Sequence, residues 1–443
     1  YDAIIMDPPS YGRGPGGEIW KLEDCIYDLI SQCEEVLSDT PLFFAVNSYT
    51  TGLSPAVMEY MLKTTLVPRF GGKTSCDEIG LPVLMRPSYV LGGQNMIVAY
   101  TKADVIEYMG VITEHVDMDH PVLLDKYILG TECEVDAICD GENFLIPGIM
   151  EQVERTGVHS GDSICVYPAQ HLTQAEIDTM VDYTGRFARE LHVTGLVNVQ
   201  YAVSNGKVYV IEVNPRSSRT VPFLSKSTGV PMAHIATQVI LGKSLREQGI
   251  TEVYGREKER WYVKAPAFSF AKIRGMESYL SPEMKSTGEA IGYDKRLNRA
   301  LYKALQAAGI PMLNYGTVLV TVADEDKEET LPLVKRFRDI GFNIEATTCT
   351  ADFLRSHGIR VKKLTNIHEG SEETLDSIRS GHVSYIINTR AILSGIHYES
   401  GEKLRRCAVD NGVTTFTSLD TVRIVLDVLE ELINKVSTID EDQ

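Results

Sequence analysis

The segment LVNVQYAVSNGKVYVIEVNPRSSRTVPF, residues 196–223, constrains the fold and function of this chain more than any other. Two runs rich in β-branched residues flank Asn205-Gly206, a dipeptide typical of a tight hairpin turn. If residue 204 faces residue 208 across a three-residue loop, one hairpin face is wholly apolar and the other is polar. The apolar face then holds Val199, Tyr201, Val203, Tyr209, Ile211 and Val213, and the polar face holds Asn198, Gln200, Glu212 and Asn214.

Oxygen-bearing side chains therefore converge from two neighbouring strands, with Arg216 and Arg219 just beyond them. Oxygen ligands bind Mg²⁺, and guanidinium groups bind a polyphosphate. The metal ion and the guanidinium groups together neutralise the charge of the phosphate oxygens. The alternative is an ordinary hairpin with a solvated polar face. Half-buried polar side chains and paired arginines need partners, however, and this favours the binding site.

Composition narrows the class of protein. A length of 443 residues predicts about two to four domains, and an apolar content of 43% supports buried cores. No apolar run is long enough to span a bilayer, and a net charge of −18 argues against a nucleic-acid scaffold. The eight cysteines lack C-x-x-C spacing, which favours reduced thiols in a cytoplasmic protein. The chain starts within an apolar strand, without an initiating methionine, and we expect a fragment.

Strand and helix patterns predict several α/β segments. Strands and helices alternate over residues 1–80, with a helix expected over 22–37, a strand over 41–46 and a second helix beginning at Ser54-Pro55. Strands dominate residues 84–223, and helices are expected over 172–192 and 230–242. From Gly316 onward strand and helix alternate again, which predicts a small doubly wound domain with a parallel sheet.

Three motifs carry a family resemblance: RPSYVLGG (86–93), GVHSGD (157–162) and IEVNPR (211–216). With them the chain, from about residue 82 to its end, resembles the C-terminal half of the carbamoyl-phosphate synthase large subunit. The resemblance implies a multidomain α/β and α+β protein, with an ATP-grasp domain followed by a methylglyoxal-synthase-like allosteric domain. It also implies that ATP, with Mg²⁺ or Mn²⁺, phosphorylates carbamate to carbamoyl phosphate for arginine and pyrimidine synthesis. We expect domains over 1–82, 83–308 and 311–443.

The resemblance also implies roles for individual residues. Gln200, Glu212 and Asn214 match the metal ligands, and Arg219 matches an arginine that steadies the transferred phosphoryl group. Arg86 matches a phosphate-contacting arginine, and Gly92 and Gly93 would let the backbone approach the nucleotide. Other residues match family positions that line the nucleotide. Lys126 and Ile128 match the stretch along the adenine, Glu134 matches the acid that holds the ribose, and the loop over the nucleotide corresponds to Gly157, Val158, His159 and Ser160. Carbamate is already a nucleophile, so positioning and charge neutralisation suffice, and His159 is given a binding role only.

Residues 1–83 follow a different pattern. DPPSYGRGPGGE (7–18) and the later NSYTTGLSP (47–55) resemble the C-terminal part of a class I S-adenosylmethionine-dependent RNA methyltransferase. The glycine-rich cofactor turn of that fold does not occur here, so we expect no methylation by this segment alone. Without the resemblance, Asp7-Pro8-Pro9 after a strand is only a turn.

The two resemblances meet at Gly80-Leu81-Pro82-Val83, a string that both families share, which suggests a fusion of gene fragments. The ATP-grasp part then lacks the α/β domain that precedes it in the family. We expect an unpaired sheet edge, an exposed apolar face and impaired activity.

The last domain resembles one that binds a phosphate-bearing nucleotide effector at strand-to-helix turns. Lys327, Thr347, Thr350 and Asn388 match its phosphate-contacting positions. Asn366 stands where some relatives carry a lysine, and Arg390 replaces a threonine. Ala265 replaces an acid of the ornithine-type site of some relatives, so we do not expect ornithine activation.

Two alternative functions stay open: a methyltransferase fragment, and an inactive fusion in which only the effector domain binds its ligand. In the intact family the reaction also requires a glutaminase small subunit and the N-terminal half of the large subunit. We expect no membrane or nucleic-acid partner.

Overall fold

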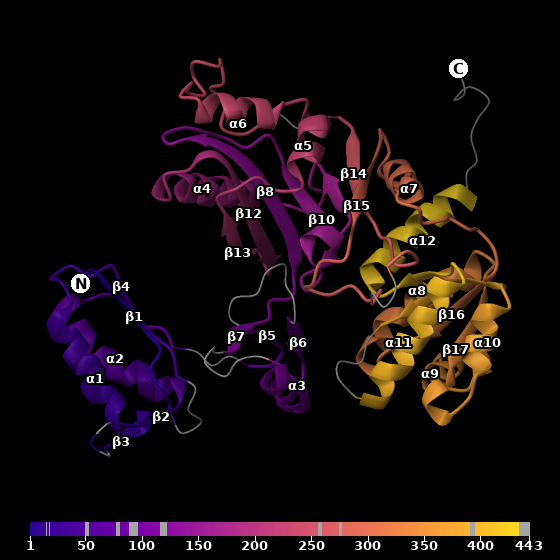
Figure 1. Cartoon of the computed structure of the whole chain (residues 1–443), viewed down its shortest axis with the longest axis horizontal. Helices are drawn as coiled ribbons and strands as arrows, with labels where there is room; N and C mark the ends of the chain where they lie inside the picture. Colours follow the sequence, from indigo (N-terminus) through magenta and orange to yellow (C-terminus); the bar gives the residue numbers. More distant parts are fainter. Residues whose placement is uncertain are drawn as a thin grey trace. The chain divides into compact units, whose positions relative to one another are not determined.

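The computed structural model describes residues 1–443 except 15, 17, 49–52, 77–79, 88–95, 116–121, 256–258, 274–276, 390–394 and 434–443 (Figure 1). The chain divides into two compact units, Tyr1–Gly80 and Leu81–Gln443. All eight cysteines are free thiols.

The first unit is a small α/β segment. Its elements are β1 (Ala3–Met6), β2 (Tyr11–Arg13), β3 (Ile19–Lys21), α1 (Leu22–Val36), β4 (Phe43–Val46) and α2 (Pro55–Phe70). β1 and β4 pair in parallel, and β2 and β3 form an antiparallel pair. One core joins both helices to the β1–β4 pair, with Leu22, Ile26, Ile30, Met58, Leu62 and Leu66 buried in it.

Both predicted helices of this unit are confirmed. Apolar residues at helical spacing bury one face of α1, as the sequence pattern requires. At the start of α2, Ser54 Oγ accepts the backbone N–H of Val57 (3.4 Å), and Pro55 occupies the first turn, where its missing N–H is harmless.

A large sheet dominates the second unit. Its described strands follow the order β13-β12-β8-β10-β11-β14-β15, and β9 pairs with β8. The bounds are β8 (Thr131–Asp140), β9 (Phe144–Leu145), β10 (Ile149–Arg155), β11 (Cys165–Tyr167), β12 (Thr194–Ser204), β13 (Lys207–Asn214), β14 (Trp261–Ala267) and β15 (Gly288–Asp294). A single 3₁₀ turn, η1 (Ser160–Asp162), lies between β10 and β11.

Helices cover both faces of this sheet. α4 (Gln174–Glu190) packs on the face that carries Cys133, Val135 and Val199. α5 (Val221–Thr228) and α6 (Met232–Ile240) pack on the opposite face, around Ile138 and Met150. α4 and α6 lie within the predicted helical ranges 172–192 and 230–242, so those predictions are confirmed.

A smaller antiparallel sheet precedes the large one. It has the order β6-β5-β7, with β5 (Val83–Pro87), β6 (Ile97–Ala99) and β7 (Val122–Lys126). α3 (Lys102–His115) packs beside it, with Tyr108 in a core that includes Val83 and Met85.

The C-terminal domain has a five-stranded parallel sheet in the order β18-β17-β16-β19-β20. The strands are β16 (Thr317–Thr321), β17 (Asn343–Thr347), β18 (Lys362–Leu364), β19 (Val383–Asn388) and β20 (Thr414–Phe416). The helices are η2 (Asp324–Asp326), α8 (Lys327–Asp339), α9 (Thr348–Ser356), η3 (Ile367–Glu369), α10 (Glu373–Arg379), α11 (Gly395–Asp410) and α12 (Leu419–Ile433). The strand order reverses between β16 and β19, as in a doubly wound fold, so the predicted fold class is confirmed.

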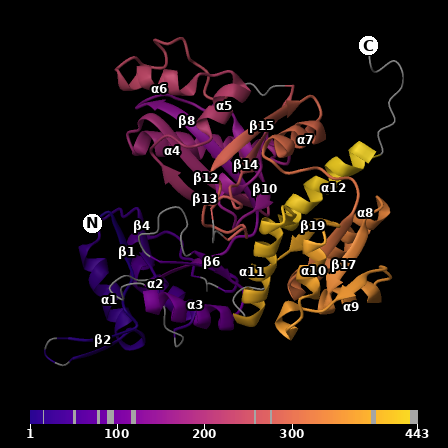
Figure 2. The same cartoon turned by 45° about the vertical axis from the view of Figure 1, so that its right-hand side comes forward.

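One apolar core runs through both domains of the second unit. α7 (Leu297–Ala307) packs on β14 and β15 and also on α12, and its Leu301 and Leu305 share a cluster with Phe337 of α8 and Val425 of α12. Both views show α12 beside α7 and α8 (Figures 1 and 2). The parallel domain is therefore packed directly against the large sheet.

Candidate active site

Acidic side chains line one face of β8. Glu132, Glu134 and Asp136 alternate along the strand, so all three point to the same side of the sheet. On the adjacent strand β12, Gln200 pairs with Glu134 and Asn198 pairs with Asp136.

The polar rows continue onto β13. There Glu212 pairs with Gln200, and Asn214 pairs with Asn198. The structure thus brings the three predicted metal ligands, Gln200, Glu212 and Asn214, onto one face at the outer edge of the described sheet.

The predicted hairpin register is right at this site and wrong at the turn. Asn205 and Gly206, with φ of 52° and 72°, form a two-residue turn between Ser204 and Lys207 rather than a three-residue loop. A β-bulge at Ile211 then shifts β13 by one residue and restores the expected pairing of Gln200 with Glu212.

The apolar face changes accordingly. Val208, not Tyr209, packs with Val199 and Tyr201 against the core under α4. Tyr209 and Ile211 are 36% and 47% exposed, so their assignment to a buried face was wrong. β13 is the outermost strand of the described sheet.

A buried hydrogen-bond network lies beneath the predicted ligands. The Asn198 amide donates to Glu134 Oε1 (2.8 Å) and Asp136 Oδ1 (3.0 Å), and the Thr220 hydroxyl donates to Asp136 Oδ2 (2.5 Å). Burial, followed by the charge of Asp136, raises the pKa of Glu134 to about 7. Glu134 Oε2 is buried and has no hydrogen-bond partner among the described residues.

Glu132 is a residue that the sequence interpretation missed. It is buried and accepts a hydrogen bond from the backbone of Gly157, the start of the predicted nucleotide loop. Burial raises its pKa to about 8. The alternating acids of the E-C-E-V-D run were the signal that could have identified it, because residues two apart share a strand face.

The predicted nucleotide loop, Gly157–Ser160, is held from several sides. Gly157 has a φ of 103°, a conformation that favours glycine. The Gln200 amide donates to Ser160 Oγ (3.1 Å), and the buried Lys264 Nζ donates to the Ser160 carbonyl (3.0 Å). Burial favours the neutral form of Lys264, but nearby Cys165 and Glu134 outweigh it and raise its pKa.

His159 lies among the charged groups of the site. Burial lowers its pKa, and Asp162, Glu212 and Arg219 are near enough to modify that pKa further. The imidazole Nδ1 accepts the backbone N–H of Gly161 (3.0 Å). Arg219, exposed after the end of β13, affects the pKa of His159, and its Nη1 contacts Met284 Sδ (3.2 Å).

Other predicted nucleotide contacts lie on or just after the smaller sheet. Ile128 follows β7, and its carbonyl accepts the hydroxyl of Thr156, next to the loop (2.7 Å). Lys126 is exposed at the end of β7. Arg86, on β5, forms an exposed ion pair with Asp125 (Nε to Oδ2, 2.8 Å). Gly92 and Gly93, and also Arg390 of the last domain, lie outside the described residues.

A cavity of about 350 Å³ opens at the carboxyl ends of the parallel strands, where the strand order reverses. Thr347, Thr350 and Asn388 line it, as predicted for an effector site. Lys327 does not line it, but its Nζ pairs with Asp324 of the lining (2.6 Å). Ligands of doubly wound folds bind at this place.

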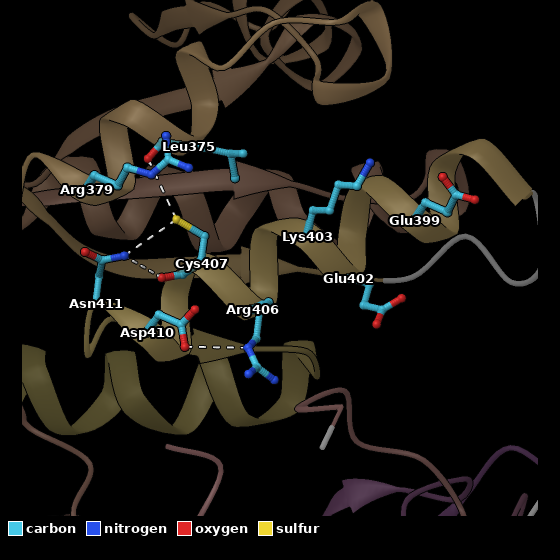
Figure 3. Close-up of a pocket in the computed structure, with 9 residues that line it drawn as sticks. All are labelled: Leu375, Arg379, Glu399, Glu402, Lys403, Arg406, Cys407, Asp410 and Asn411. Atoms are coloured by element: carbon cyan, nitrogen blue, oxygen red, sulfur yellow. Dashed lines mark hydrogen bonds and ion pairs between the residues drawn. The ribbon is translucent and has the colours of Figure 1, made fainter. Parts of the chain in front are cut away.

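A larger, more open hollow of about 760 Å³ lies between α10 and α11 (Figure 3). None of the predicted site residues lines it. Figure 3 shows the ion pair of Arg406 with Asp410 on its rim (3.5 Å), and Arg379 pairs with Asp376 (3.0 Å). Two of its lining cations, Arg379 and Arg406, are engaged by neighbouring acids, and the predicted site residues lie elsewhere, so the hollow is not the candidate active site.

Within the described ranges no group of three or more His, Cys, Asp or Glu side chains is arranged to hold a metal ion, so a metal site would depend on amide oxygens such as those of Gln200 and Asn214. No described helix is long and apolar enough to cross a membrane. The resemblance of the segment around Asp7-Pro8-Pro9 to an RNA methyltransferase stays a prediction.

Comparison with known proteins identifies two domains. Residues 72–248 match the family described as "Carbamoyl-phosphate synthase L chain, ATP binding domain", and residues 329–417 match the "MGS-like domain". The first match begins at residue 72, before the start of the second compact unit at Leu81.

Several solved structures are also similar to the chain. Biotin carboxylase from Campylobacter jejuni, in a β,γ-ATP complex, has 16% identity and a TM-score of 0.41 over 63% of this chain and 64% of that one. The biotin carboxylase domain of a single-chain bacterial carboxylase has 16% identity and a TM-score of 0.37 over 50% and 54%. N5-carboxyaminoimidazole ribonucleotide synthetase from Thermotoga maritima has 13% identity and a TM-score of 0.38 over 52% and 62%.

The chain thus spans between half and two thirds of the length of these three proteins. Its own two family matches follow one another along the sequence. An ATP-grasp ATP-binding domain followed by an MGS-like domain is the architecture of the C-terminal half of a carbamoyl-phosphate synthase large subunit, and this chain has that architecture.

Proposed function

We propose that this chain is an ATP-dependent ligase component that phosphorylates carbamate to carbamoyl phosphate. The observation that carries the proposal is the row of oxygen ligands on β8, β12 and β13 beside the loop Gly157–Ser160 and Arg219. Acceptor phosphorylation by ATP requires such a convergence of anion-binding and metal-binding groups.

The reaction balances without an added acid or base. A carbamate oxygen forms a bond to the γ-phosphorus of ATP while the bond from that phosphorus to the β,γ-bridging oxygen breaks. The products are carbamoyl phosphate and ADP, and no proton must move. The residues of the chain then have to bind, orient and neutralise charge.

The donor set on β12 and β13 fits Mg²⁺. Gln200 donates its amide nitrogen to Ser160, so its oxygen is the atom available to a metal. Asn214 likewise donates its amide nitrogen to Glu212 Oε1 (2.8 Å), and Glu212 supplies a carboxylate. Oxygen ligands of this kind are what Mg²⁺ takes, and the ion would neutralise phosphate charge during transfer. Mn²⁺ accepts similar ligands.

The loop and the arginine have separate tasks in this proposal. The loop Gly157–Ser160 covers the nucleotide. Because the pKa of His159 is lowered, its imidazole is neutral and can form hydrogen bonds without adding charge. Arg219 stabilises the equatorial oxygens of the transferred group, where charge is spread during phosphoryl transfer. Arg86, Lys126, Ile128 and Glu134 keep their predicted nucleotide contacts as part of the proposal.

The proposal extends to partners and regulation. A nucleotide effector would bind the cavity lined by Thr347, Thr350 and Asn388. Carbamate would come from the N-terminal half of a large subunit, supplied with ammonia by a glutaminase subunit, in cytoplasmic arginine and pyrimidine synthesis.

Replacing Glu212 with Gln tests the site. Calorimetry should show that the variant binds Mg-ATP about ten-fold more weakly, because a charged ligand of the metal is lost. A ten-fold loss of affinity corresponds to about 1.4 kcal/mol of binding free energy. Glu190→Gln, an exposed glutamate at the end of α4, is the matched control and should bind as the parent chain does. Equal Mg-ATP affinity in Glu212→Gln and the control would contradict the assignment.

A further inference from the structure

Met284 contacts the arginine to which the proposed function assigns the transferred phosphoryl group. Its Sδ accepts a hydrogen bond from Nη1 of Arg219 (3.2 Å). Arg219 is exposed and Met284 is half-buried, so the contact lies at the surface of the site. Among the described residues no carboxylate forms an ion pair with Arg219, and its positive charge is therefore not neutralised. No motif in the sequence singled out Met284.

The segment that carries Met284, between β14 and β15, is fixed to the nucleotide loop on both sides of this residue. Before it, the carbonyl of Ser281 accepts the backbone N–H of His159 (2.9 Å). After it, the backbone N–H groups of the next two residues donate to the two carboxylate oxygens of the buried Asp162 (2.7 and 2.8 Å). Met284 thus projects from a segment that is held against the stretch His159–Asp162.

A glycine leaves room for the thioether over that stretch. A Cβ at Gly161 would lie 3.2 Å from Met284 Sδ and 3.2 Å from His159 Nδ1, which is closer than ordinary van der Waals contact. Gly161 does not have a positive φ, so space rather than backbone conformation favours glycine here. The loop and the Met284 side chain therefore fit together, with the sulfur directed to Arg219.

We propose that Met284 is a positioning residue that holds the Arg219 guanidinium beside the nucleotide loop for phosphoryl transfer. A thioether is a weak and neutral acceptor, so it can orient the guanidinium and still leave its charge for phosphate oxygens. A carboxylate in the same place would form a charge-assisted pair with Arg219 and compete with the phosphate. The inference rests on the proposed function, because it takes Arg219 as the group that meets the transferred phosphoryl.

The contact can be measured in the full chain without turnover. Phenylglyoxal, which modifies guanidinium groups, is the probe, and peptide mass spectrometry gives the rate at each arginine. Leucine at position 284 has a similar size but no acceptor, whereas glutamine can accept through its amide oxygen. Met284→Leu should raise the modification rate of Arg219 by about five-fold, as expected for the loss of one hydrogen bond, and Met284→Gln should not. Arg216, exposed and bonded to the Ser217 carbonyl (3.0 Å), is the internal control and should react equally in all three chains.

Turnover then separates positioning from a general structural role. The assay is ATP formation from carbamoyl phosphate and Mg-ADP. Met284→Leu should lower kcat by about five-fold or more with little change in the KM of Mg-ADP, because Arg219 acts on the transferred group. Met284→Gln should retain most of the activity. In an Arg219→Gln background Met284→Leu should have no further effect, since it acts through Arg219. Met109→Leu, on α3 and 36% exposed, is the matched control and should behave as the parent chain does.

Each failure has a distinct meaning. Equal Arg219 reactivity in the parent chain and Met284→Leu overturns the contact, whether or not the chain is active. A loss of kcat in Met284→Leu that persists in the Arg219→Gln background, or that Met284→Gln shares, overturns the positioning role. A parent chain that forms no ATP contradicts the proposed function instead, and the phenylglyoxal rates then decide whether Met284 holds Arg219.

Discussion

The pair between Arg155 and Asp420 offers a quantitative test of how the two domains of the second unit are joined. Arg155, at the end of β10, donates from Nε and Nη2 to the carboxylate of Asp420 on α12 (2.7 Å each). It also donates from Nη1 to Glu329 of α8 (3.2 Å). Arg155→Met keeps most of the aliphatic stem and removes all of these bonds.

The size of the effect follows from the exposure of the partners. The Asp420 side chain is 10% exposed, and breaking a buried ion pair costs about 3–5 kcal/mol. The Arg155 side chain is 37% exposed, however, so solvent screens part of the interaction. Arg423 still contacts Asp420 in the variant (3.0 Å). We therefore expect a loss of roughly 2 kcal/mol.

Tryptophan fluorescence can isolate this region. The chain has only two tryptophans, Trp20 and Trp261, and Trp261 packs against the core shared by α7 and the parallel domain. In a Trp20→Phe background, urea unfolding followed by Trp261 compares Arg155→Met, Asp420→Asn and the double variant. The double-mutant cycle should give a coupling free energy of about 1–2 kcal/mol at pH 7.

The coupling should also depend on pH. Burial would raise the pKa of Asp420, but the hydrogen bonds and charge of Arg155 outweigh it and hold that pKa below its ordinary value. A lowered carboxylate pKa contributes stability that is complete above the unfolded-state pKa of about 3.9 and is lost as the pH falls through the folded pKa. The coupling should therefore be constant near neutral pH and shrink in acid. A coupling below about 0.5 kcal/mol at pH 7, the limit of additivity for independent sites, would refute the reasoning.

Two further substitutions test local packing by urea unfolding of the full chain. Gly292→Ala should destabilise by about 1–3 kcal/mol, because its Cβ would lie 2.2 Å from the carbonyl oxygen of Ala300 in α7. Gly288→Ala on the same strand is its control, since the nearest atom to that Cβ is 3.8 Å away, and an equal loss in both would contradict the steric argument. Thr173→Ala should cost about 1 kcal/mol by removing the reciprocal cap with Glu176 at the start of α4. Thr173→Ser should retain most of that stability, and a loss as large as that of the alanine variant would exclude capping as the cause.

The hairpin shows how far sequence patterning reaches. Alternation correctly paired Gln200 with Glu212, because a polar row must share one face. It could not locate the bulge at Ile211, since Val208, Tyr209, Val210 and Ile211 are all apolar and fit either register. The turn type was the better local guide, because Asn205-Gly206 adopts positive φ at both positions and closes a two-residue turn.

Tertiary contacts set a second limit on prediction. The sequence motifs assigned Glu134 of β8 to the nucleotide. Glu132 points to the same side of that strand, so alternation alone could not distinguish the two acids. Only the folded loop shows that Gly157 contacts Glu132. Arg405 and Glu277, which form an ion pair (Nη2 to Oε2, 2.6 Å), are 128 residues apart, and no local pattern joins them. Helices and strand faces follow from periodicity, whereas partners across domains follow from packing.

The outermost position of β13 affects how this protein behaves in concentrated solution. The run Val208–Ile211 combines β-branched and aromatic residues on the edge strand of the described sheet, which is the kind of segment that adds strands from other molecules. The bulge at Ile211 twists that edge, and Lys207 and Glu212 place a charge at each end of the run. The strand that carries Glu212 and Asn214, the proposed metal ligands, is thus also prone to intermolecular β-pairing, and its bulge and flanking charges oppose aggregation.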